Sequence, residues 1–232
     1  MNKYIIIIIV VIIIIFVVIP IIYTMITKKE FKEDFPLFMR FVNRLLLDKL
    51  TLNHKLIYGF TLFIGRQGGG KTYSAVQYCY DLCKKNKSLL LSNTPLNPPA
   101  DINYQFMKRL DDINYLPECS SYVIFLDEIQ TLFDSYTKND DFYTIFCQLR
   151  KRNIKLVGTA QVFDRVSLKL REQVHNLYGC RTFFGCVTWV REYFPFLNSS
   201  GKLSQKSTFG IGSKIYIQSD KIRNMYDTFF KI

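Results

Sequence analysis

Histidine and tryptophan are scarce in this sequence, and the cysteines lack the spacing that metal sites use. The 232 residues include one tryptophan and two histidines, His54 and His175. None of the six cysteines forms a Cys-x-x-Cys pair, which argues against a zinc site. Free, reduced thiols in a cytosolic domain fit this pattern better than disulfides. No internal repeat or low-complexity linker follows the N-terminal segment, so the length predicts one domain of ordinary size plus an appendage.

Acidic side chains are also few. The 19 aspartates and glutamates are outnumbered by 31 lysines and arginines, which leaves a formal net charge of +12. A balance this basic favours anionic partners, either nucleic acid or the negatively charged cytoplasmic face of a membrane. The alternative is a compositional effect, because the chain is rich in the Ile, Phe, Tyr, Asn and Lys that AT-rich genomes encode, and charge alone identifies no partner.

The N-terminal segment is an uncharged apolar run from Tyr4 to Ile26. It exceeds the roughly 20 residues that a helix needs to cross the hydrocarbon core, so we expect a transmembrane anchor within residues 1–27. A cleavable signal peptide fits less well, because the run is too long and no small-residue cleavage site follows it. Only Lys3 precedes the run, whereas basic residues follow it closely: Lys28, Lys29, Lys32, Arg40 and Arg44. This asymmetry predicts an outside N-terminus and a cytoplasmic C-terminal part, on the side where ATP is found.

Residues 28–56 form a basic segment next to the predicted anchor. Apolar residues recur in it at helical spacing, with Arg40 and Arg44 between them: Phe38, Phe41, Val42, Leu45 and Leu46. The spacing predicts an amphipathic helix. Such a helix suits the membrane interface and equally suits packing on a globular domain.

Residues 57–232 alternate strand-like and helix-like segments, which predicts an α/β domain with a mainly parallel sheet and helices on both faces. The part beyond Leu177 is rich in β-strand patterns. The expected strands are Phe60–Ile64, Leu89–Leu91, Tyr122–Leu126, Ile154–Val157, Tyr178–Phe184, Val187–Val190 and Lys214–Ile217, and the expected helices are Tyr73–Cys83 and Phe142–Leu149.

The segment between the first expected strand and the first expected helix fits G-x-x-x-x-G-K-[ST], the P-loop pattern, in full. Glycines at these positions let successive backbone N–H groups surround phosphate oxygens, and the following helix adds its positive dipole end. We expect Lys71 to reach the β- and γ-phosphates of ATP and Thr72 to hold Mg²⁺ through its hydroxyl. The nucleotide-binding residues are then Gly65, Arg66, Gln67, Gly68, Gly69, Gly70, Lys71, Thr72 and Tyr73.

Two further pieces of a hydrolytic site follow the P-loop. The apolar strand Tyr122–Leu126 ends in Asp127 and Glu128. We expect Asp127 to join the Mg²⁺ shell, as the Walker-B aspartate does, and Glu128 to orient and polarise the attacking water. Gln161 follows the strand that lies between the P-loop strand and the Walker-B strand in ATPases with this extra glutamate, so it is a candidate sensor of the γ-phosphate. The alternative is a surface glutamine.

A basic cluster, Arg150, Lys151 and Arg152, precedes the expected strand at Ile154. Arg150 or Arg152 is a candidate to stabilise transition-state charge at the nucleotide of a neighbouring subunit. The cluster also suits contact with DNA, or a solvated helix end with favourable dipole placement. Arg165 and Arg171 are further candidates on weaker grounds.

These motifs resemble, in chain order, those of the zonular occludens toxin-like family, which includes the assembly ATPase of filamentous phages and lies within the FtsK–HerA group of P-loop motors. The matching segments are Gly65–Thr72, Ser92–Leu96, Leu126–Gln130, Leu149–Arg152 and Thr159–Gln161, and Arg171 falls where the family tends to have an arginine. The resemblance covers about residues 60–185. It implies a RecA/FtsK-like fold, a homo-oligomeric ring, hydrolysis of ATP with Mg²⁺, and export of single-stranded phage DNA through the host inner membrane.

The chain departs from the family pattern in two respects. The filamentous-phage proteins usually carry their membrane span after the ATPase domain, and the arginine segment here lacks the His-Arg-His character of the family. An anchor that precedes the motor domain also resembles FtsK and the coupling proteins that pump DNA.

Three functions therefore remain open. The first is a membrane-bound motor that moves DNA, single-stranded DNA being favoured, or assembles virions with coat or assembly proteins. The second is a cellular or plasmid translocase of duplex DNA, although no separate DNA-reading module is visible. The third is a membrane scaffold that uses nucleotide only as a switch.

Overall fold

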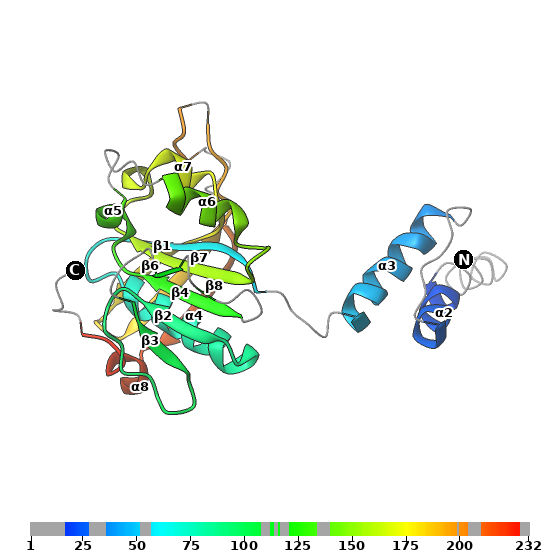
Figure 1. Ribbon diagram of the computed structural model, residues 1–232, viewed down its shortest axis with the longest axis horizontal. Helices are drawn as coiled ribbons and strands as arrows, with labels where there is room; N and C mark the ends of the chain where they lie inside the picture. Colours follow the sequence, from blue (N-terminus) through cyan, green and yellow to red (C-terminus); the bar gives the residue numbers. More distant parts are fainter. Residues whose placement is uncertain are drawn as a thin grey trace, which may run out of the picture. The chain divides into compact units, whose positions relative to one another are not determined.

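The chain divides into two compact units, Met1–Lys55 and Leu56–Ile232. The computed structural model describes residues 17–27, 36–51, 57–107, 112–113, 116, 121–133, 140–198, 200–203 and 210–227. The described part of the first unit is helical, and the second unit contains the sheet (Figure 1).

The first unit contains the helices α2 (Ile19–Thr27) and α3 (Leu37–Thr51). A buried polar contact joins them, because the amide of Asn43 donates to the hydroxyl of Thr24 at 2.7 Å. That hydroxyl donates in turn to the carbonyl of Pro20 at 2.6 Å. The predicted amphipathic helix is confirmed as a helix, but its buried side differs from the predicted stripe. Met39, Asn43 and Leu47 are buried, whereas Phe38 and Phe41 are exposed.

The predicted membrane span falls only partly within this unit's described residues. Residues 4–16 of the span Tyr4–Ile26 lie outside them, and α2 occupies its C-terminal end. Among the described residues, no helix combines the length and the apolar character that crossing a membrane requires.

The second unit is built on an eight-stranded sheet with the order β3-β2-β4-β5-β1-β6-β7-β8. The strands from β3 to β6 in this order run parallel, and β7 and β8 continue the sheet antiparallel. The predicted parallel sheet is therefore confirmed, as is the strand expected between the P-loop strand and the Walker-B strand. The strands are β1 (Gly59–Ile64), β2 (Leu89–Ser92), β3 (Tyr104–Phe106), β4 (Tyr122–Leu126), β5 (Ile154–Ala160), β6 (Val174–Phe183), β7 (Val187–Tyr193) and β8 (Gly210–Ile217).

Helices cover both faces of this sheet, as the sequence predicted (Figure 1). One face carries α4 and α8, and the other carries α5, α6 and α7. Their bounds are α4 (Lys71–Asn86), α5 (Ile129–Leu132), α6 (Asp140–Gln148), α7 (Leu168–Arg171) and α8 (Asp220–Arg223), with a 3-10 turn, η3, over Phe163–Arg165.

Apolar side chains on both sides of the central strands explain why these segments form the core. Every residue of β4 is buried, which is the pattern of a parallel strand covered on both faces. In β1, Phe60 and Leu62 pack with α6, whereas Phe63 packs with α4. Because the central strands are parallel, the residues that follow β1, β2, β4 and β5 all meet at one edge of the sheet. That edge carries the P-loop.

Several boundaries differ from those that the sequence predicted. β3 was missed, because it is a three-residue strand with largely exposed side chains. β6 begins at Val174 rather than Tyr178, since His175 and Asn176 interrupt the apolar pattern while Val174 and Leu177 are buried. α4 extends beyond Tyr73–Cys83 in both directions, to the P-loop lysine and to an exposed basic end.

Replacing Phe60 by alanine tests the packing that holds the sheet together. Phe60 is fully buried and meets the ring of Phe146 edge-on, with 5.3 Å between the ring centroids. We expect Phe60→Ala to lower the free energy of unfolding by about 3–5 kcal/mol, measured by urea denaturation of the full chain. The matched control is Phe184→Ala, since Phe184 is 94% exposed, and its effect should stay within about 0.5 kcal/mol. Equal effects of the two substitutions would contradict this core assignment.

Candidate nucleotide-binding site

The P-loop lies against strand β6. A Cβ added at Gly65 would come within 2.5 Å of the carbonyl oxygen of Cys180, a backbone atom that cannot move aside. Gly70 has a φ of 81° and precedes α4 directly. A Cβ there would come within 2.5 Å of the Thr182 hydroxyl. The P-loop glycines are therefore needed both for the turn and for the close contact with β6.

The phosphate-binding groups expected from the pattern are in place. α4 has 16 residues and starts at Lys71, so its N-terminal N–H groups and its positive dipole end lie at the loop. The Lys71 side chain is buried and folds back over the loop, where its ammonium donates to the carbonyl of Arg66 at 3.3 Å. The N–H of Gly69 donates to the same carbonyl at 2.9 Å. The ammonium thus sits against the loop that the phosphates would occupy.

Asp127 is the point where the loop and two strands meet. Its Oδ1 accepts hydrogen bonds from the hydroxyl of Thr72 at 3.3 Å and from the hydroxyl of Thr159 at 2.5 Å. Burial raises the pKa of the Asp127 carboxyl, and the neighbouring Glu128 adds to this effect. The two hydroxyl donors and the Lys71 ammonium favour the carboxylate and act in the opposite direction. The Thr72 hydroxyl and the Asp127 carboxylate are oxygen donors of the kind that Mg²⁺ takes beside nucleotide phosphates.

The backbone of Asp127 and Glu128 is held from the neighbouring strands. The side chain of Asn93, just after β2, accepts from the Asp127 N–H at 2.8 Å and donates to the Asp127 carbonyl at 3.3 Å. The Glu128 N–H donates to the Thr159 hydroxyl at 2.9 Å. One threonine in β5 therefore positions both the Asp127 carboxylate and the Glu128 backbone.

Glu128 adopts a left-handed backbone conformation, with a φ of 48° and a ψ of 51°. For a residue other than glycine this conformation costs of order 1–3 kcal/mol, and such residues concentrate at functional sites. The hydrogen bond to Thr159 is part of what holds Glu128 there. The glutamate that the sequence singled out for water activation is thus held in a strained turn beside Asp127.

Gln161 lies beside the P-loop. It follows the last residue of β5, at the same sheet edge, and it lines a cavity together with Gly65 and Arg66. The structure therefore brings Gln161 close to the start of the loop, and its role as a sensor of the γ-phosphate stays a prediction.

Arg150 and Arg152 lie at the opposite edge of the sheet. They precede β5, whereas the site lies beyond its end, and a parallel strand of seven residues spans about 20 Å. Arg150 stacks over the ring of Tyr58, 5.4 Å from its centroid, and Arg152 bonds to Gln148. The proposed catalytic arginines are thus not positioned to contact a nucleotide bound to the same chain. A contact with a neighbouring subunit's nucleotide stays a prediction.

Tyr73 also points away from the loop. Its side chain is buried, its ring lies near that of Tyr216 in β8, and its hydroxyl accepts from the N–H of Ser219 at 2.9 Å. Only its backbone remains close to the phosphate position, because it lies in the first turn of α4. The side chain of Tyr73 therefore braces α4 rather than lining the nucleotide site.

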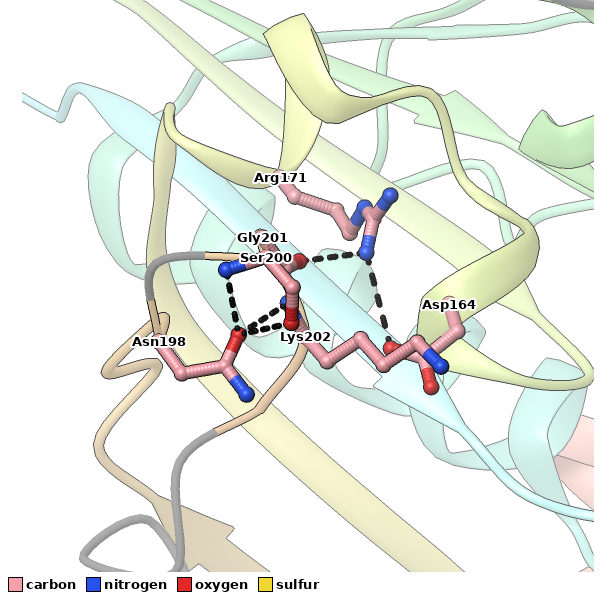
Figure 2. Close-up of polar contacts among 6 residues, drawn as sticks. All are labelled: Asp164, Arg171, Asn198, Ser200, Gly201 and Lys202. Carbon is pink, nitrogen blue, oxygen red and sulfur yellow. Dashed lines mark hydrogen bonds and ion pairs between the residues drawn. The ribbon is translucent and has the colours of Figure 1, made fainter.

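Arg171 is a bridge between two surface segments (Figure 2). Its guanidinium forms an ion pair with Asp164 at 3.5 Å and donates to the carbonyl of Gly201. In the same turn, the side chain of Asn198 accepts from the N–H groups of Ser200 and Lys202 at 3.1 Å and 2.9 Å. These contacts give Arg171 a structural role, because they tie α7 to the turn that contains Asn198 and Gly201.

Thr159 and Asn93 are site residues to which the sequence gave no role of their own. They entered only as part of the segments that resemble the zonular occludens toxin-like family. Their importance depends on hydrogen bonds between strands that are far apart in the chain, which no local pattern reveals. A polar residue at or near the carboxyl end of each buried strand is the signal that points to them.

The sequence matches no protein-family model and no curated protein. The fold is similar to the N-terminal domain of zonular occludens toxin from Neisseria meningitidis, with 15% identity and a TM-score of 0.53 over 74% of this chain and 100% of that one. More distant are the DNA-packaging ATPase B204 from Sulfolobus turreted icosahedral virus (15% identity, TM-score 0.43, 54% and 76% of the chains) and the flagellar accessory protein FlaH from Methanocaldococcus jannaschii (16%, 0.42, 74% and 95%). The resemblance to zonular occludens toxin predicted from the motifs is thereby confirmed in the fold.

Proposed function

We propose that the chain is a membrane-anchored ATPase that energises virion assembly or the movement of DNA across a membrane. The observation that carries the ATPase assignment is the convergence of Thr72 and Thr159 on the carboxylate of Asp127, beside Lys71 and Glu128. This arrangement combines, at one sheet edge, groups that bind phosphate, hold a divalent cation and activate water.

Each of these groups has a defined task in hydrolysis. The loop N–H groups and Lys71 bind and neutralise the β- and γ-phosphates of ATP. Thr72 and Asp127 would hold Mg²⁺, which supplies further neutralisation of phosphate charge. Glu128 orients and polarises the attacking water, and Gln161 contacts the γ-phosphate from the end of β5.

The braced Glu128 favours turnover over a scaffold that only binds nucleotide. A switch protein needs the phosphate loop and the cation site, but it does not need a carboxylate held in a strained backbone conformation next to them. The hydrogen bond from Glu128 N–H to Thr159 fixes the backbone from which that carboxylate extends. We therefore assign Glu128 to the hydrolytic step.

Membrane anchoring rests on the sequence. The uncharged run Tyr4–Ile26 and the lysines that follow it support one N-terminal span, with the N-terminus outside and the ATPase unit in the cytoplasm. If the protein is viral, the membrane is the inner or cell membrane of the host. An anchor at this position holds an ATPase beside the exit route of its cargo.

The cargo is inferred from charge and resemblance. The net charge of +12 suits a polyanion, and the resemblance to phage assembly ATPases favours single-stranded DNA or coat and assembly proteins. Motors of this kind work as rings of identical subunits. In such a ring, Arg150 or Arg152 reaches nucleotide only if one subunit turns that edge of its sheet toward the P-loop of the next.

Glu128→Gln tests the assignment of the water-activating group. The amide keeps the size of the side chain but cannot polarise water as a carboxylate does, so we expect ATP turnover to fall about 10²–10⁴-fold. Binding of ATP, measured by filter retention, should persist. The matched control is Glu172→Gln, an exposed glutamate at the end of α7, which should retain full phosphate release. Undiminished turnover in the Glu128 variant would refute the role.

Thr159→Val tests the brace on Asp127 and Glu128. Valine keeps the shape of threonine but removes the hydroxyl that donates to Asp127 and accepts from Glu128. We expect the Mg²⁺ concentration needed for half-maximal ATP hydrolysis to rise about 10–100-fold, as with other residues that position metal ligands. Thr159→Ser keeps the hydroxyl and should stay near the wild type. A valine variant with an unchanged Mg²⁺ titration would rule out the brace.

Deleting residues 1–27 tests the anchor. The full chain should stay in the membrane pellet after a sodium carbonate wash, whereas the shortened chain should be released. A control chain in which an unrelated apolar span replaces residues 4–26 should remain in the pellet. In inside-out vesicles, added protease should cut the ATPase unit. Retention of the shortened chain after the wash would show that the attachment lies elsewhere.

A further inference from the structure

A cavity opens beside the first residues of the P-loop. It encloses about 640 Å³, within the range of roughly 300–1,000 Å³ that is usual for small-molecule sites. Gly65 and Arg66 form part of its lining, and Gln161 lies on its wall. The cavity therefore adjoins the start of the loop in which the phosphates of a nucleotide would lie.

The floor of the cavity is the face of β6 and β7 that turns away from α4. Trp189, Arg191 and Tyr193 alternate along β7, so they share one face, and Tyr193 pairs with the core residue Leu177 on that face. Gly179 in β6 lies under the ring of Tyr193, because a Cβ added there would come within 2.8 Å of that ring. The missing side chain at Gly179 thus lets the Tyr193 ring lie against β6.

The outer wall is held in position by the Arg171 bridge (Figure 2). Asp164 and Leu203 both line the cavity, and they belong to the two segments that Arg171 ties together. The side chain of Arg171 is only 12% exposed, and it also stacks over Phe163, another lining residue. The buried guanidinium of Arg171 therefore holds the segments that form this wall in position.

The order of the strands predicts how a bound nucleotide would be oriented along the sheet. Asp127 follows β4, on one side of β1, whereas β6 and β7 lie on the other side. A triphosphate seated in the loop with its terminal phosphates toward Asp127 and Glu128 has its sugar and base on the side of β6 and β7. The cavity lies where the base would extend.

The lining combines an aromatic ring with hydrogen-bond donors, which suits a heteroaromatic base. Trp189 offers a ring for stacking, and beside it the guanidinium of Arg191 lies over the ring of Tyr193, 5.4 Å from its centroid. Arg66 and Arg181 also line the space, and guanidinium groups donate hydrogen bonds to the ring nitrogens of a purine and to the exocyclic oxygen of guanine. A purine fills more of this volume than a pyrimidine does.

We infer that this cavity is the purine-base subsite of the nucleotide site, with Trp189 as its stacking residue. This inference rests on the proposed function, because it requires that the P-loop bind the triphosphate. It assigns to the β-rich C-terminal strands a part in recognising nucleotide.

Trp189 makes the test direct, because it is the only tryptophan in the chain. Its fluorescence is followed in the full-length protein while Mg-ATP, Mg-GTP or Mg-tripolyphosphate is added. We expect ATP and GTP to change the emission. Tripolyphosphate should displace bound ATP in a competition assay without producing that change, since it occupies the loop and has no base.

Substitution supplies a second readout. Trp189→Ala should weaken ATP binding about 10-fold or more, the scale of a lost base-stacking contact, and leave tripolyphosphate binding unchanged, which also shows that the variant is folded. Trp189→Phe keeps a ring face and should bind ATP nearly as tightly as the wild type. The matched control is Phe184→Ala, which removes an exposed aromatic ring that does not line the cavity.

The possible failures are distinguishable. If ATP and tripolyphosphate compete for the loop but Trp189 emission and the affinity of Trp189→Ala for ATP do not change, the base subsite is refuted and the proposed function stands. A change in emission with single-stranded DNA and not with nucleotide would likewise refute the subsite and point to a nucleic-acid groove. If neither ATP nor tripolyphosphate binds, the proposed function fails and the subsite with it.

Discussion

Two hydroxyl groups from different parts of the chain donate to one carboxylate oxygen of Asp127. Thr72 lies at the start of α4, and Thr159 lies near the end of β5. The side chain of Asn93, after β2, forms two hydrogen bonds to the backbone of Asp127. This convergence is possible because the parallel strands β1, β2, β4 and β5 end at one edge of the sheet. The buried core therefore sets the distances in the site, since any shift between these strands would separate the groups to which we assign phosphate binding, Mg²⁺ binding and water activation.

Strand β6 has a second organising role. The Cys180 carbonyl in β6 lies where a side chain at position 65 would be, so glycine is needed there for the P-loop to contact β6. The same strand carries Gly179, over which the Tyr193 ring lies, and thereby forms the floor of the cavity next to the loop. One strand thus links the position of the phosphates to the position that we assign to the base. We therefore assign to the C-terminal β-rich part of the chain a share in the nucleotide site as well as in the sheet.

The chemistry carried by contiguous residues could be predicted from the sequence, and the chemistry carried across strands could not. Gly65–Thr72 and Tyr122–Glu128 each combine a buried strand with its functional residues, so local pattern and local geometry agree. Arg150 and Arg152 show the limit: they are close to Gln161 in sequence, but β5 lies between them and the site, so they are at the opposite sheet edge. Thr159 and Asn93 act through hydrogen bonds between strands, so sequence spacing could not predict their roles. The buried face of α3 depends on packing within its own unit, so spacing could not predict that face either.

The most direct measurement of the central claim is phosphate release by the full-length chain in lipid nanodiscs, with ATP and Mg²⁺, in the presence and absence of single-stranded DNA. We predict turnover that requires Mg²⁺, rises when single-stranded DNA is added, and loses this stimulation as salt is raised, because phosphate contacts depend on counterion release. A folded, membrane-embedded protein that hydrolyses no ATP under either condition would contradict the assignment of this chain as a membrane-bound ATPase motor.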